Sequence, residues 1–148
     1  MPPVPLKRGV YKIYAHIFGL PALATVRAFQ TSQGFPFVTD RPEDPPFQQE
    51  LAIEPFENVP GSPYLIYIAA QPQLGVVENE QHLWSKEEPR EQWTRWHFEP
   101  FVGGLRIVAE KSGSVWRAEY HGKQIDVTPP KGEPQEGWTP EFVRPIDV

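Results

Sequence analysis

The sequence predicts an all-β domain, and three observations support this fold class. The 148 residues include 19 prolines and 11 glycines spread along the whole chain, and an interior proline costs a helix roughly 3 kcal/mol. Five Trp, nine Phe and five Tyr supply the large apolar side chains that pleated strands favour. A strand-like motif recurs three times at a fixed spacing. At this length the strands are expected to enclose a single core.

The recurring motif is nine residues long and overlays without gaps. Its copies are 48–56 (QQELAIEPF), 93–101 (WTRWHFEPF) and 138–146 (WTPEFVRPI). The shared proline falls at intervals of 45 residues, at Pro55, Pro100 and Pro145. The motif therefore predicts one domain over residues 1–148, made of three units. Their approximate bounds are 9–58, 59–102 and 103–148.

Each unit is expected to contain four strands in the same order. The first strands are 10–15, 64–68 and 105–109. Two runs around a turn then predict a hairpin in each unit. The predicted hairpin strands are 25–29 with 35–39, 74–78 with 81–85, and 115–120 with 123–127. The motif strand ends each unit, so we expect twelve strands in all.

Twelve strands in three units fit a β-trefoil, a six-stranded barrel capped by three hairpins. A propeller is excluded because it typically needs four to eight blades, whereas closing a barrel removes the exposed strand edges. The motif aromatics are expected to fill the core and to carry no function. They are Phe56, Trp93, Trp96, Phe101 and Trp138.

Composition excludes several functional classes. Without cysteine the chain has neither disulfides nor thiolate metal ligands. Its net charge of −5, with scattered basic residues, argues against a nucleic-acid partner. The longest apolar run, 64–70, is too short to span a bilayer. No apolar segment follows the charged N-terminus, so we expect a cytoplasmic protein without a membrane partner.

The sequence predicts no catalytic centre. Its four histidines, at positions 16, 82, 97 and 121, lack metal-ligand spacing. Nucleophile-elbow, phosphate-binding and dinucleotide-binding patterns are also missing from the sequence. We therefore expect no enzyme activity, no metal and no cofactor. Binding through loops on a rigid scaffold remains, and the proline-rich loops would lose little entropy on binding.

The chain also resembles a known family. The opening G-V-Y-K-I-Y at 9–14, the absence of cysteine and the repeated W/F…E-P-F strands look like the fungal β-trefoil serine protease inhibitors of the cospin type. The mycocypins are more distant relatives of that family. The resemblance covers the whole chain, and it implies a monomer whose partner is a trypsin-like serine protease.

The resemblance also implies a reactive site at Arg27, in the loop between the second and third strands. The carboxylate at the base of trypsin's S1 pocket would attract this side chain, and the Arg27–Ala28 bond would lie at the enzyme's catalytic serine. Thr25 and Val26 would favour an extended approach that pairs with the enzyme backbone. The flanking residues of this loop are Thr25, Val26, Phe29 and Gln30.

The repeat supplies an alternative to this assignment. Arg117-Ala118 repeats the dipeptide two units later, so Arg27 could be an ordinary exposed hairpin residue. The longer loop after Arg27, 30–34, favours Arg27 as the reactive site. A weaker second candidate is Asn79, in the loop between the fifth and sixth strands, for an asparagine-specific protease.

Two further classes stay open. A carbohydrate-binding trefoil usually repeats Q-x-W motifs, and only Gln92-Trp93 comes near one. An interaction module without a protease target is the third possibility. Protease inhibition is the function that the resemblance favours.

Overall fold

The computed structural model describes residues 4–17 and 19–146. Strands make up nearly all of the regular structure there, together with two 3-10 turns, η1 (Arg90–Gln92) and η2 (Pro134–Glu136). The strands are β1 (Gly9–Ile17), β2 (Leu20–Val26), β3 (Phe35–Asp40), β4 (Leu51–Pro55), β5 (Tyr64–Ile68), β6 (Gln71–Asn79), β7 (His82–Glu87), β8 (Trp96–Phe101), β9 (Gly104–Ala109), β10 (Val115–Arg117), β11 (Asp126–Thr128) and β12 (Thr139–Arg144). The predicted count of twelve is thus confirmed within the described residues.

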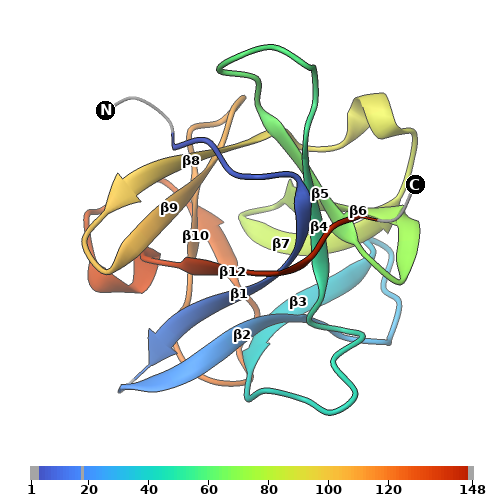
Figure 1. The fold of residues 1–148 in the computed structure, drawn as a ribbon. Helices are drawn as coiled ribbons and strands as arrows, with labels where there is room; N and C mark the ends of the chain where they lie inside the picture. Colours follow the sequence, from blue (N-terminus) through green and yellow to red (C-terminus); the bar gives the residue numbers. More distant parts are fainter. Residues whose placement is uncertain (1–3, 18, 147–148) are drawn as a thin grey trace.

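Six strands close into a barrel. β1 pairs with β4 and β12, β5 pairs with β4 and β8, and β8 pairs with β9. The ring closes where Leu105 in β9 and Trp138, directly before β12, exchange two backbone hydrogen bonds of 2.7 Å. Figure 1 shows β1 and β12 side by side across the middle of the molecule. Closure leaves these strands without a free edge.

Three hairpins form the second part of the fold. They are β2–β3, β6–β7 and β10–β11. β7 pairs with both β3 and β11, and the Ile125 N–H donates to the Phe37 carbonyl at 2.9 Å, which links the first and third hairpins. Each hairpin is therefore supported by the other two.

The barrel core contains a cluster of three tryptophans. Trp116 meets Trp96 and Trp138 edge to face, with ring centroids 5.6 and 5.5 Å apart. All three side chains are fully buried. The indole N–H of Trp96 donates to the Val76 carbonyl at 3.1 Å, and that of Trp138 to the Trp116 carbonyl at 3.1 Å. These bonds offset the cost of burying a polar donor.

The third copy of the motif is out of register with the gapless overlay. The overlay places Trp93 opposite Trp138, yet Trp93 packs in a separate cluster with Tyr67. Trp96 and Trp138 both lie in the main core. The indole N–H of each donates to the first hairpin strand of its own unit, β6 for Trp96 and β10 for Trp138. Trp96 and Trp138 are thus the structural counterparts, 42 rather than 45 residues apart.

Two motif aromatics are only partly buried, contrary to expectation, although Phe56 packs against the cluster that contains Trp93. Phe56 directly follows β4, and Phe101 is the last residue of β8. Arg95 covers the Phe56 ring at 4.0 Å and Arg106 covers the Phe101 ring at 5.2 Å. Cation–π contacts of this kind contribute about 0.5–1 kcal/mol at exposed sites.

Candidate functional site

The segment between β2 and β3 is fixed to the sheet where it begins. The Val26 N–H donates to the Gln48 carbonyl at 3.0 Å, and the Arg27 N–H donates to the Pro36 carbonyl at 2.9 Å. Thr25 and Val26 themselves are buried and pair with Val38 and Phe37 of β3. Their backbone therefore already pairs within the sheet, and their role beside an enzyme stays a prediction.

A tight turn fixes the other end of the segment. Thr31 and Gly34 exchange backbone hydrogen bonds of 2.9 and 3.3 Å, and the Thr31 hydroxyl accepts from the Gln33 N–H at 3.1 Å. Gly34 has φ of 118°, a conformation that a side chain disfavours. The Gln33 amide also donates to Glu80 at 3.0 Å, so the turn rests on the neighbouring β6–β7 hairpin.

Three residues between these anchors are exposed. Ala28, Phe29 and Gln30 lie outside any strand, and the Phe29 side chain is 61% accessible to solvent. Within the described part of the chain, their backbone N–H groups have no hydrogen-bond acceptor. This short segment, which we term the 28–30 segment, has free backbone donors yet is held at both ends.

The Arg27 side chain lies beside the 28–30 segment and is ion-paired. Its guanidinium contacts Asp40, and a second bond reaches Glu43 at 3.2 Å. One quarter of the side chain is exposed. The sequence alone does not reveal these partners, because neither carboxylate has a spacing that marks it as a partner of Arg27.

A buried glutamine positions one of these carboxylates. The Gln49 side chain is fully buried and accepts from the Glu43 N–H at 2.9 Å. Its amide donates to the Thr25 hydroxyl at 3.1 Å and to the Arg41 carbonyl at 2.8 Å. Gln49 thereby ties the proline-rich 41–46 loop to β2, and it keeps Glu43 next to Arg27.

Arg117, the counterpart of Arg27 in the repeat, is buried rather than exposed. It contacts Glu119 at 2.7 Å, Glu133 at 2.6 Å and the fully buried Glu136 at 3.6 Å. The hydrogen bond from Arg117 lowers the pKa of the Glu119 carboxyl below its usual range. Arg117 therefore belongs to the interior and offers nothing to a protease.

Asn79 is the last residue of β6, not part of a loop between β5 and β6. Glu80 and Gln81, with φ of 51° and 66°, form the two-residue turn that follows it. Two central residues with positive φ are typical of a tight hairpin turn. Asn79 therefore lies on the edge of a groove rather than on a projecting loop.

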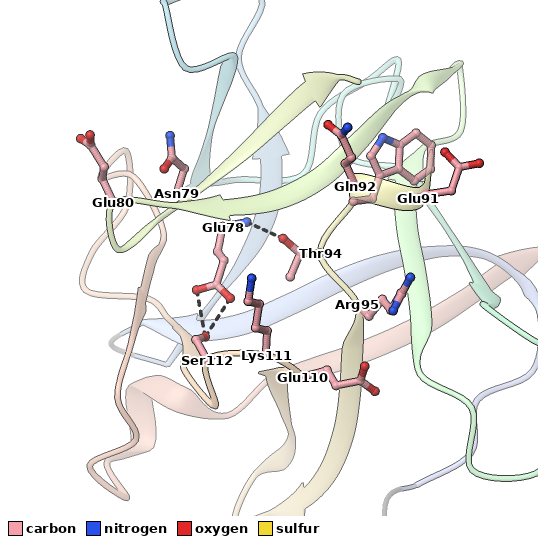
Figure 2. A pocket seen from close by; sticks show the side chains of 11 residues that line it. Glu78, Asn79, Glu80, Glu91, Gln92, Thr94, Arg95, Glu110, Lys111 and Ser112 are labelled. Carbon is pink, nitrogen blue, oxygen red and sulfur yellow. Dashed lines mark hydrogen bonds between the residues drawn. The ribbon is translucent and has the colours of Figure 1, made fainter. Parts of the chain in front are cut away.

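This groove has a volume of about 890 Å³ and a mostly polar lining. Figure 2 shows Glu78 directed toward Ser112, with Thr94 and Lys111 beside them. The Ser112 hydroxyl donates to Glu78 at 2.8 Å, and the Glu78 N–H donates to the Thr94 hydroxyl at 3.0 Å. Much of the lining is thus already hydrogen-bonded within the protein.

Residues 4–17 and 19–146 contain no helix of the length and apolar character needed to cross a membrane. The same residues contain no group of three or more His, Asp or Glu side chains placed to hold a metal ion.

No protein-family model matches the sequence, and no curated protein matches it. Similar solved structures do exist. The Rhizoctonia solani agglutinin has a TM-score of 0.75 at 9% identity, over 95% of this chain and 99% of that one. A proteinase inhibitor from Coprinopsis cinerea has a TM-score of 0.66 at 17% identity, over 94% and 100%.

A third similar structure is a Polyporus squamosus lectin bound to a sialylated epitope, with a TM-score of 0.74 at 11% identity over 94% of this chain and 50% of that one. At such identities the likeness shows the fold alone. It confirms the all-β prediction and groups the fold with the β-trefoil proteins. Because this fold is shared by an inhibitor and by lectins, the fold does not decide between protease inhibition and carbohydrate binding.

Proposed function

We propose that the protein inhibits trypsin-like serine proteases through the β2–β3 loop, with Arg27 entering the S1 pocket. The observation that carries this proposal is the 28–30 segment. An exposed stretch with free backbone donors, held at both ends, fits an active-site cleft at little cost in conformational entropy. The likeness to the Coprinopsis cinerea proteinase inhibitor adds support at the level of fold.

Entry of Arg27 into a protease pocket requires an exchange of partners. Its contacts with Asp40 and Glu43 are solvent-accessible ion pairs, and such pairs typically contribute about 0–1 kcal/mol each. The carboxylate at the base of a trypsin-type pocket can replace them in a desolvated setting. The pairs therefore lower the affinity modestly without preventing binding.

The loop also explains how a substrate-like segment would resist net cleavage. If the Arg27–Ala28 bond were cut, the Arg27 side would stay bonded to Pro36, and the chain after Gln30 would stay fixed by the turn at Thr31. The two new ends would remain close together. Religation would then compete with release, as an inhibitor requires.

The test is titration of active-site-calibrated trypsin with the wild-type protein and with Arg27→Ala. Loss of the anchor should weaken inhibition by at least about 2 kcal/mol, or about thirtyfold. Arg27→Lys should retain most of it, because trypsin also accepts lysine. Arg41→Ala is the matched control, since Arg41 is an exposed arginine of the adjoining loop. Full inhibition by Arg27→Ala would refute the assignment.

Carbohydrate binding is a second candidate, favoured by the polar groove beside Asn79. Its volume of about 890 Å³ would admit a sugar, although Trp93 at the groove is only 5% exposed and offers little ring surface for stacking. Binding to a glycan array that is lost in Asn79→Ala, without any effect on trypsin, would favour this function over the first.

A further inference from the structure

Unlike Arg27, Phe29 has neither a backbone N–H nor a side chain that is bonded within the described part of the protein. Its ring is 61% exposed, so a partner that covers the ring would remove a large apolar surface from water. Arg27 uses its backbone N–H for Pro36 and its guanidinium for two carboxylates. Phe29 lies at the centre of the 28–30 segment and is therefore available to a partner without any bond being broken first.

The surroundings of Phe29 suit an apolar contact. A groove of about 450 Å³ begins next to Phe29, at Arg27 and Ala28, and continues to Phe35 and Phe47, although Phe29 itself does not line it. The Phe47 ring at its rim is also 61% exposed. Aromatic anchors surrounded by near-neutral apolar contacts are typical of residues that dominate an interface.

We propose that Phe29 is a second specificity residue of the loop and enters the apolar S1 pocket of a chymotrypsin-type serine protease. This inference rests on the proposed function, because it uses the same loop in the same extended approach. Pockets of this type are hydrophobic slots that accept an aromatic ring, whereas trypsin's carboxylate selects a cation. One loop would thus serve two protease classes through two neighbouring side chains, one enzyme at a time.

The backbone favours this use of Phe29. An extended segment can pair its backbone with an enzyme where its N–H groups are free. Those of Ala28, Phe29 and Gln30 have no acceptor among the described residues. The turn at Thr31–Gly34 limits the movement of the segment, which reduces the entropy lost on docking.

The experiment measures inhibition of chymotrypsin and of trypsin by the same set of variants. Phe29→Ala should weaken chymotrypsin inhibition at least thirtyfold and trypsin inhibition less than tenfold, while Arg27→Ala should show the opposite pattern. Phe29→Leu should retain most chymotrypsin inhibition, because a hydrophobic slot accepts leucine. Leu20→Ala is the matched control, an apolar side chain of nearly equal exposure at the far end of β2 from the loop, and should change either constant less than threefold.

The outcomes separate this inference from the proposed function. Wild-type protein that inhibits trypsin but not chymotrypsin would overturn the role of Phe29 and leave the proposed function standing. Loss of both activities in Arg27→Ala, or unchanged chymotrypsin inhibition by Phe29→Ala, would also overturn it. Inhibition of neither enzyme by the wild type would refute the proposed function itself.

Discussion

The hairpin ends of the first and third units carry the same Arg-Ala dipeptide in two different settings. Arg27 is one-quarter exposed and pairs with two solvent-accessible carboxylates, whereas Arg117 is one-tenth exposed and reaches the fully buried Glu136. The loop after Arg27 continues into the exposed 28–30 segment, but Ala118 is buried and its N–H donates to Gln135 at 3.0 Å. The same dipeptide at equivalent positions of the repeat can therefore be buried in one unit and partly exposed in another.

The largest expected effect is on stability at Arg117. Arg117→Met should lower the free energy of unfolding by about 3 kcal/mol, because it removes the nearer of the two arginine charges beside the fully buried Glu136, which keeps Arg106 and the N–H groups of Lys131 and Gly132. Arg27→Ala should change it by no more than about 2 kcal/mol, because its two partly exposed ion pairs contribute about 0–1 kcal/mol each. Urea denaturation of both variants measures the difference. Equal losses would show that the two arginines occupy equivalent environments.

The turns of the first and third hairpins differ in the space around their glycines. A Cβ added at Gly34 would lie 2.5 Å from the Ser85 carbonyl oxygen, whereas one at Gly122 would meet no atom within 4 Å. Gly122→Ala should cost about 1–2 kcal/mol from positive φ alone, and Gly34→Ala should cost more. Only Gly34→Ala should also weaken protease inhibition, since it displaces the turn that fixes the 28–30 segment. Equal inhibition by both variants would show that this turn does not support the loop.

A smaller effect is expected when the Arg27 side chain is freed. Glu43→Gln removes one ion pair of Arg27, which is worth up to about 1 kcal/mol. Trypsin inhibition should therefore strengthen by no more than about fivefold. Chymotrypsin inhibition should stay unchanged, because Phe29 does not depend on this pair. Weaker trypsin inhibition would instead assign Glu43 a supporting role in the bound loop.

The smallest effect concerns pH in the third unit. Since the Arg117 hydrogen bond lowers the pKa of Glu119 in the folded protein, the carboxylate stabilises the fold above its ordinary pKa of about 4.3. This contribution is lost as the pH falls through the lower folded value. Wild type should therefore exceed Glu119→Gln in urea stability at neutral pH, and the difference should shrink toward pH 3. A constant difference would contradict the lowered pKa.

The sequence predicted the fold well and the site only in part. Proline content and strand-like runs placed most strands within a few residues, since both act locally. The 45-residue overlay paired Trp138 with Trp93, although its structural counterpart is Trp96. Because a tryptophan also lies at position 93, nothing in the sequence indicates that the third copy is shifted by three residues. The Arg27 partners were missed because Asp40 and Glu43 are brought there by β3 and by the buried Gln49. Exposure of Phe29 is likewise a property of the folded loop.

The buried tryptophans give the protein an optical reporter of its own integrity. All five are at most 6% exposed, so their fluorescence should lie to the blue in the folded state and shift to the red on unfolding. The edge-to-face contacts among Trp96, Trp116 and Trp138 should also couple their electronic transitions and give a near-ultraviolet circular dichroism signal. Any loop variant that keeps both signals has retained its barrel.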